Sequence, residues 1–376
     1  MSTTQKDYPS VAIVILNWNG EGFLRKFLPS VYQSKYPNLS LYVADNGSSD
    51  ESLAFLEKEG FQYQNSQDAS SSQRDYPRYI IKLPENYGFA QGYNLALKQV
   101  EADYYILLNS DVEVSPNWIQ PVIDLMEKDP QVAACQPKIK MQADKKLFEH
   151  AGASGGWIDK FGYPFCRGRI FFDVEKDNGQ YDDAQEVFWA SGAALFIRGS
   201  LFHQIGGFDG DFFAHMEEID LCWRLKRANY KIMVQPASQV WHVGGGTLPV
   251  TSPRKAFLNF RNSLTMVFKN ESKWRMLWVI WVRLILDGVA GVRFLMKGEF
   301  ANIGSIIKAH WQFFFGIPKH IKKRKRMKVL VQKYAYQQNP KMNMIGRYPK
   351  SIISAYFLGK KQTFKSLNMN SLKNNK

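Results

Sequence analysis

Short apolar runs alternate with amphipathic stretches along the first 130 residues. Four runs are rich in β-branched or aromatic residues and predict buried strands: 11–18 (VAIVILNW), 39–50 (LSLYVADNGSSD), 79–83 (YIIKL) and 103–114 (DYYILLNSDVEV). After each run the apolar positions recur at helical spacing, in residues 23–31, 51–60, 88–100 and 116–130. Four strand–helix repeats predict parallel strands with right-handed crossovers, and therefore a doubly wound α/β sheet.

The rest of the chain divides into two parts. Residues 131–255 are richer in aromatic residues and glycine, and we expect them to complete the sheet and to shape a second pocket. Prolines near residue 250 then interrupt the pattern. We therefore predict two domains, 1–255 and 256–376.

Charge is distributed unevenly between these two domains. Residues 256–376 contain 24 Lys and Arg but 3 Asp and Glu, which gives a net charge of +21 and leaves −6 for residues 1–255. The composition, 45% hydrophobic and 22% charged, is typical of a globular protein and excludes a disordered one. An acidic body and a basic C-terminal region are expected to face different partners.

The sequence also bears on the cellular compartment. Three scattered cysteines, Cys135, Cys166 and Cys222, are too few for a disulfide framework or a zinc site, which favours a reducing, cytoplasmic setting. The first ten residues contain an acid and no apolar segment, so no signal peptide is predicted. No run of about 18 uncharged apolar residues occurs, so no transmembrane helix is predicted.

Polar residues follow the predicted strands, where doubly wound sheets bind ligands. Asp111 follows Asn109 by two residues and suits a hard divalent cation, although such residues also favour ordinary turns. Asp45 either contacts a ribose or belongs to a turn at Asn46 and Gly47. The glycines of NYGFAQGYN (86–94) would let the backbone approach phosphates at a helix N-terminus.

Two further features of the second part suggest chemistry. The segment EEID (217–220) opens a predicted helix, where the helix dipole alone would favour acids. Carboxylates so close together repel each other, however, and the raised pKa that results suits a general base. A single histidine such as His242 is commonly structural, but a metal bound at Asp111 would make it a candidate ligand.

Seven motifs occur in one order: VAIVILNWNG, DNGSSD, NYGFAQGYN, LLNSD, WASGAALFIR, FDGDFFAHMEEIDLCWRL and VWHVGGGT. Together they resemble the family 2 inverting glycosyltransferases of GT-A fold, over about residues 10–262. The branch that they resemble most is the rhamnosyltransferase-like one, which builds bacterial cell-surface polysaccharides. The resemblance implies a Rossmann-like, mostly parallel sheet flanked by helices and a site for a nucleotide-sugar donor.

The resemblance also implies roles for individual residues on the donor side. Asp45 matches the acid that contacts the donor's base or ribose, and Asn109 with Asp111 matches a DxD-type element whose first acid is here Asn. Asp111 and His242 are the implied ligands of Mg²⁺ or Mn²⁺. Further donor contacts are implied for Asn17, Asn86, Gly88 and Asn94.

On the acceptor side, the resemblance implies that Glu218 is the general base, with Glu217 as the second candidate. Glu218 stands where the family usually has Asp, so its carboxylate reaches about one methylene further. The implied acceptor and sugar pocket contains Trp189, Ser191, Gly192 and Asp220. The implied reaction is one direct displacement at the anomeric carbon.

The C-terminal region contains a predicted amphipathic helix at 273–298. Arg275, Arg283, Asp287, Arg293 and Lys297 share one face, and the opposite face holds Leu277, Trp278, Trp281, Leu284, Ile285, Val292 and Leu295. A second helix follows, with Ile303, Ile306, Ile307, His310, Trp311 and Phe314 at helical spacing. Residues 319–328 (KHIKKRKRMK) then contain seven Lys and Arg.

This pattern favours binding to an anionic membrane surface, and so a peripheral location on the inner face of the cell membrane. The alternatives are packing on the catalytic domain, a homo-oligomer interface and, least favoured, nucleic acid. The expected partners of an active enzyme are a nucleotide-sugar donor and a saccharide or lipid-linked acceptor. The competing hypothesis is a catalytically silent nucleotide-sugar-binding scaffold at the membrane.

Overall fold

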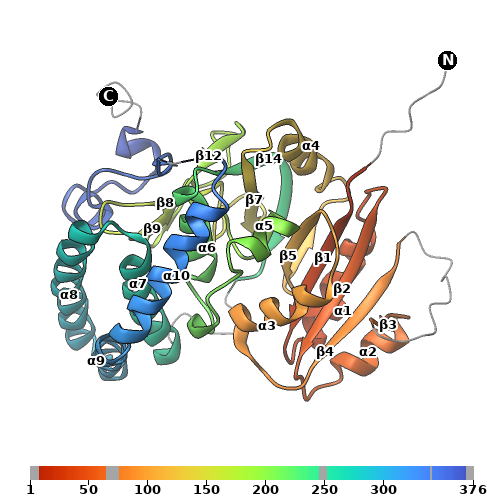
Figure 1. Cartoon of the computed structure of the whole chain (residues 1–376), viewed down its shortest axis with the longest axis horizontal. Helices are drawn as coiled ribbons and strands as arrows, with labels where there is room; N and C mark the ends of the chain where they lie inside the picture. Colours follow the sequence, from red (N-terminus) through yellow and green to blue (C-terminus); the bar gives the residue numbers. More distant parts are fainter. Residues whose placement is uncertain (1–7, 65–75, 245–251, 339–340, 370–376) are drawn as a thin grey trace.

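The computed structural model describes residues 8–64, 76–244, 252–338 and 341–369. The polar segment 65–75 and Pro249, near the predicted domain boundary, lie outside these ranges. A central sheet runs through the molecule, and a layer of helices from the C-terminal region covers one side (Figure 1).

The first half of the sheet is parallel, as predicted. Its strands are β1 (Val11–Asn17), β2 (Leu39–Asn46), β3 (Gln62–Tyr63), β4 (Arg78–Leu83) and β5 (Tyr104–Asn109). They lie in the order β5-β1-β2-β4-β3, and every neighbouring pair is parallel. The predicted strand 103–114 is two strands, because the chain turns at Ser110 and Asp111 before β6 (Val112–Val114).

Helices cover both faces of this half, and the period-two alternation of each strand supplies both cores. Ile13 and Ile15 of β1 face α1 (Glu21–Tyr32), α2 (Ser52–Lys58) and α4 (Gln120–Lys128). Ala12 and Val14 belong to the opposite core with α3 (Gly88–Ala96), α5 (Gly199–Gln204) and α6 (Glu217–Arg227). A short 3₁₀ turn, η1 (Leu97–Gln99), ends α3.

The second half of the chain completes the sheet, as expected. It adds β7 (Val132–Met141), β12 (Gln185–Val187), β13 (Ala194–Arg198) and β14 (Lys231–His242) in the order β12-β14-β7-β13-β5, while β6 also pairs with β14. A separate four-stranded sheet consists of β8 (Gly156–Ile158), β9 (Pro164–Cys166), β10 (Arg169–Ile170) and β11 (Asp173–Val174). The 3₁₀ turn η2 (Gly210–Phe212) precedes α6.

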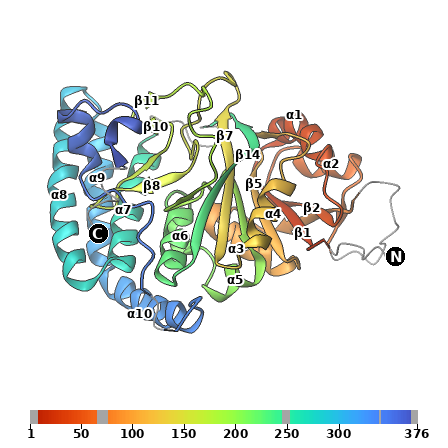
Figure 2. The ribbon, with the colours of Figure 1, turned by 90° about the horizontal axis from the view of Figure 1, so that it is seen from above.

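Four helices form the C-terminal layer: α7 (Pro253–Asn270), α8 (Lys273–Met296), α9 (Phe300–Phe315) and α10 (Ile317–Lys333). Figures 1 and 2 both show α7 nearer the sheet and α8 at the outer edge. Leu264 and Phe268 of α7 pack against Met276 of α8 and Phe313 of α9. Among the described helices, none is both long and apolar enough to cross a bilayer.

The chain then returns to the body that is built on the central sheet. Tyr348, Ile352, Phe364 and Leu367 belong to the same core as α3 and α6. The backbone N–H of Tyr348 donates to the carbonyl of Ile158 at 2.7 Å, which fastens this segment to β8. Two short helical turns occur there, η3 (Ser354–Leu358) and η4 (Lys365–Leu367). The predicted α/β sheet with a helical C-terminal extension is confirmed.

Candidate active site

The carboxyl ends of β1, β2 and β5 bring the predicted donor residues to one edge of the sheet. Asn17 lies opposite Asp45 in the register of β1 and β2, and Leu16 lies opposite Asn109 in β1 and β5. Residues that end three different strands therefore meet, because parallel strands share one carboxyl edge.

Asp45 and Asn17 form the inner wall of this edge. The Asn17 side-chain amide donates to Oδ1 of Asp45 at 3.4 Å, and the backbone N–H of Ser48 donates to Oδ2 at 3.1 Å. Oδ1 of Asn17 is buried and has no hydrogen-bond partner within the described residues. A buried acceptor without a partner is costly, so this oxygen is suited to receive a ligand donor.

Asn86 and Gly88 form a loop beside β2. The side chain of Asn86 accepts a hydrogen bond from the Gly88 N–H at 2.8 Å and another from Asn46 at 3.1 Å. Gly88 has φ +74°, and a Cβ there would lie 2.5 Å from the ring of Phe213, so only glycine fits. The bracing role of Asn46 was missed, because its side chain looked like part of a turn.

Asn94 does not face the donor edge, which corrects the prediction for this residue. Its amide donates to the carbonyl of Phe208 at 2.9 Å and accepts from the N–H of Phe208 at 2.9 Å. Both polar groups of the side chain are therefore used to hold the loop before η2 against α3.

Asp111 and His242 come together although they are far apart in sequence. The antiparallel pairing of β6 with β14 places His242 opposite Val112, and His242 Nε2 lies 3.1 Å from Asp111 Oδ1. The amide nitrogen of Asn109 lies 3.5 Å from the same Nε2. The other ring nitrogen, Nδ1, lies 3.4 Å from Oε2 of buried Glu149.

The charges of this cluster are strongly coupled. Burial opposes the charged form of His242, but hydrogen bonds and charge from Asp111 and Glu149 outweigh it and raise the pKa of His242 to about 10. Burial likewise opposes ionisation of Glu149, and its bond to His242 holds the pKa of Glu149 below the usual value. Glu149 was missed at the sequence level, because nothing in its neighbours marks it.

The residues present fit a divalent cation only in part. Within the described ranges no group of three or more His, Cys, Asp or Glu side chains is arranged to hold a metal by itself. Asp111 supplies one carboxylate, and His242 would supply one imidazole after it releases its proton, a donor set open to Mn²⁺ or Mg²⁺. Donor phosphate oxygens would have to complete the coordination.

A strained loop leads to the predicted base. Phe213, His215 and Met216 have φ of 63°, 70° and 75°, which costs non-glycine residues about 1 kcal/mol or more each. Asn262 of α7 holds this loop, because its side-chain nitrogen lies within 2.9 Å of the carbonyl oxygens of Phe212, Ala214 and His215. Strain supported from outside in this way is typical of functional sites.

Glu217 and Glu218 begin α6 directly after this loop. Burial raises the pKa of Glu218 to about 7, and burial together with the charge of Glu218 raises the pKa of Glu217. Oε2 of each lacks a hydrogen-bond partner within the described part of the chain. Glu218 is the more accessible of the two, whereas Glu217 is buried, so Glu218 is better placed to meet an acceptor.

The segment 191–193 connects this base to the donor edge. A Cβ built on Gly192 would lie 3.8 Å from Cβ of Glu218 and 3.3 Å from the ring of Phe89. The carbonyl of Ala193 accepts the Asn109 N–H at 3.0 Å. Gly192 therefore lies beside Glu218, and its place in an acceptor pocket stays a prediction.

The other three predicted pocket residues have supporting positions. Ser191 is buried, and its hydroxyl donates to the carbonyl of Ala151, while the indole of Trp189 donates to that of Trp157 at 2.9 Å. Asp220 is fully buried and bonds Arg224, Lys269 and Asn270. The prediction that Asp220 lines the pocket is therefore wrong: partners from α6 and α7 surround its carboxylate, which anchors the base helix.

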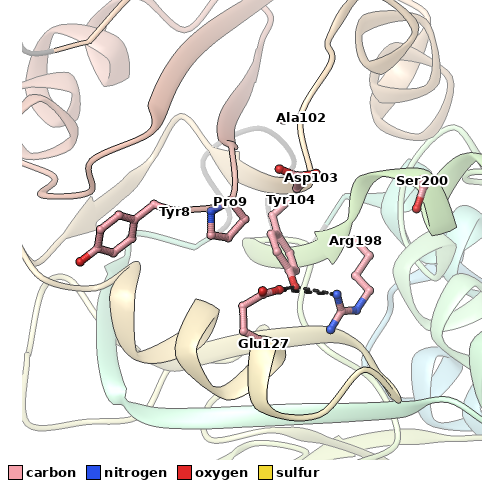
Figure 3. A pocket seen from close by; sticks show the side chains of 8 residues that line it. All are labelled: Tyr8, Pro9, Ala102, Asp103, Tyr104, Glu127, Arg198 and Ser200. Atoms are coloured by element: carbon pink, nitrogen blue, oxygen red, sulfur yellow. Dashed lines mark hydrogen bonds and ion pairs between the residues drawn. The ribbon is translucent and has the colours of Figure 1, made fainter. Parts of the chain in front are cut away.

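A hollow of about 460 Å³ lies at the opposite, amino end of β1 and β5 (Figure 3). Tyr104 and Arg198 in its wall are hydrogen-bonded at 2.6 Å, and Tyr104 also bonds Glu127. These three side chains are thus paired with one another. We do not take this hollow as the reaction site, because the buried oxygens of Asn17, Glu217 and Glu218 that lack a partner in the described residues lie elsewhere.

Comparisons with known proteins identify the family of this chain. The model of glycosyl transferase family 2 matches residues 10–201. The N-acetylglucosaminyl-diphospho-decaprenol L-rhamnosyltransferase of Mycobacterium tuberculosis is 25% identical over 61% of this chain and 75% of its own length. Rhamnosyltransferase WbbL of Escherichia coli K12 is 26% identical over 42% of this chain and 61% of its own.

A solved structure supports the fold. GalNAc-T7, crystallised with UDP, GalNAc and Mn²⁺, is similar with a TM-score of 0.52 at 16% identity, over 70% of this chain and 48% of that one. The chain therefore belongs to glycosyl transferase family 2, as a rhamnosyltransferase-like enzyme of GT-A fold.

Proposed function

We propose that this enzyme moves a sugar from a nucleotide-diphosphate donor to a saccharide or lipid-linked acceptor during cell-surface polysaccharide synthesis, with the assistance of a divalent cation. The observation that carries the proposal is the meeting of Asp111 and His242 at 3.1 Å on the carboxyl edge. The names of two relatives favour rhamnose as the transferred sugar. We propose dTDP-rhamnose as the donor, with a UDP-hexose as the alternative.

The chain's own residues would divide the work. Asp45 and Asn17 would hold the base or ribose, with the loop at Asn86 and Gly88 beside the diphosphate. Asp111 and His242 would hold Mg²⁺ or Mn²⁺, which would offset diphosphate charge when bound.

Glu218 would take the proton from an acceptor hydroxyl as that oxygen attacks the anomeric carbon. The new glycosidic bond forms while the bond to the diphosphate breaks, so the configuration inverts. Gly192 leaves space for the acceptor in front of Glu218, and Glu217 stays the second candidate for the base.

Donor binding tests this proposal. Full-length protein would be titrated with a panel of nucleotide sugars in Mn²⁺, Mg²⁺ or EDTA, alongside Asp111→Ala. We expect one donor to bind with metal and to lose affinity in the variant. Binding without turnover of any acceptor would favour the silent scaffold, and no binding at all would refute both.

We also propose that the enzyme lies on the cytoplasmic face of an anionic membrane. Residues 1–255 would form the catalytic domain, and residues 256–376 would form the membrane-attachment region. Support comes from the net charge of +21 in the latter and from exposed Trp274, Trp278, Trp281 and Trp311. The basic segment is only partly available, because Lys319 and Lys323 pair with Asp211. Co-sedimentation with anionic vesicles tests this part, and self-association without vesicles would favour the homo-oligomer instead.

A further inference from the structure

A groove separates α8 from α9 on the outer side of the C-terminal layer. It has a volume of about 410 Å³, within the usual range for ligand sites. Its walls are mostly aliphatic and include Leu284, Val292, Leu295, Ile303, Ile306 and Ile307. Asp287 and His310 close one end, paired at 3.0 Å.

Two glycines open this groove. A Cβ built on Gly288 would meet nothing within 4 Å, and one on Gly291 would meet only Cδ1 of Ile306 at 3.8 Å. Neither glycine is therefore required by packing, and each destabilises a helix by about 1 kcal/mol relative to alanine. Because these two positions carry no side chain, the apolar groove stays open.

The surroundings of the groove indicate what fills it. On both helices the outward surface is apolar, and Trp278 stacks on Trp281 while Trp311 stacks on Phe315. Arg283 of α8 is buried instead, where it donates to the Ser263 hydroxyl at 2.7 Å. A groove that opens onto an apolar surface within a strongly basic region suits an anionic lipid with a long hydrocarbon chain.

The α9 wall of the groove lies along α7, where Arg261 of α7 donates to Gln312 of α9 at 3.4 Å. The hydroxyl of Ser305, between the groove residues Ile303 and Ile306, donates to the carbonyl of Pro253 at 2.8 Å. Pro253 begins α7, which holds the loop in front of Glu217 through Asn262. A chain lying in the groove would thus be separated by one helix from the loop that precedes Glu217.

We infer that this groove binds the hydrocarbon chain of the lipid-linked acceptor, an inference that rests on the acceptor class in the proposed function. The chain would be held by apolar contact between α8 and α9 while its phosphate end points toward α7. The groove would then select acceptors by their lipid as well as by their sugar.

The test fills the groove. Full-length Gly288→Leu/Gly291→Leu would be compared with wild type and with Gly304→Leu, a matched control on α9 where a Cβ also meets nothing within 4 Å. The probe is a long-chain polyprenyl phosphate in mild detergent, with binding counted by native mass spectrometry. We expect the double variant to bind at least about tenfold more weakly, equivalent to about 1.4 kcal/mol, and the control to bind like wild type.

Two outcomes would overturn the inference: equal binding by the double variant, or equal competition by phosphatidylglycerol, which would make the groove a site for bulk lipid. Donor binding in Mn²⁺, measured on the same samples, separates this result from failure of the proposed function. If donor binding is intact and filling the groove does not weaken lipid binding, the groove inference is wrong while the proposed function stands.

Discussion

The carboxyl edge of the sheet and the α8–α9 layer both bury charged groups, but they present opposite surfaces to the outside. At the edge, Asp111 and His242 are buried side by side, with 3.1 Å between Oδ1 and Nε2. On α8, Arg283 and Asp287 point inward while Trp278 and Trp281 are more than half exposed. Polar side chains thus gather at the sheet edge, where we propose that a polar donor binds. Apolar side chains cover the outside of α8, where we propose contact with lipid.

The largest effect should come from Glu218→Gln, which removes the proposed base while keeping its shape. We expect transfer to fall by about 10² to 10⁴-fold with donor affinity unchanged. Turnover and calorimetric donor binding, measured side by side, check this. If Glu217→Gln abolished transfer instead, the roles of the two acids would be exchanged.

Glu149→Gln tests whether the carboxylate behind His242 supports metal binding. Glu149 touches no substrate in our proposal and acts by orienting His242, so we expect Mn²⁺ affinity to fall by about 10 to 100-fold. Electron paramagnetic resonance of free Mn²⁺ in the presence of UDP or dTDP measures this without turnover. Unchanged affinity together with an unchanged melting temperature would remove Glu149 from the metal site.

The pH profile tests whether Glu218 works as a buried base. Only the carboxylate accepts a proton, and its pKa is raised to about 7, so activity should rise with pH through that value. Between pH 6 and pH 8 we expect kcat/KM to increase by about tenfold. A profile that is flat over this range would contradict the assignment.

The smallest effect concerns the basic helix α10. Lys325 is exposed, so Lys325→Gln should weaken binding to anionic vesicles by about 1 kcal/mol. Lys319→Gln removes the same charge from a lysine already paired with Asp211 at 2.5 Å, and should matter less. Equal losses would mean that only total charge counts.

The strands of the first half could be predicted from their short, β-branched apolar runs. Because parallel strands share one carboxyl edge, the meeting of the polar residues that end them could be predicted as well. Residues whose partners come from later segments were harder. Asp220 resembles any acid in a first helical turn, and only Lys269 and Asn270 of α7 show that it is an anchor. Glu149 has no local signal, because its meaning depends on the distant His242. For α8, the sequence identified the two faces, but only the fold reveals that the apolar one points outward.

Asn262 of α7 holds the loop before Glu217 through three backbone carbonyls, which limits how such enzymes can be recombined. Because α7 holds the loop before Glu217 and, in our proposal, also begins the membrane-attachment region, the two functions would share one helix. Recombination that exchanged the chain after residue 255 would bring in a foreign clamp together with a foreign anchor. We therefore expect related enzymes to change their acceptor and their membrane contact by point substitutions. Exchange of the whole C-terminal region between enzymes should be rare.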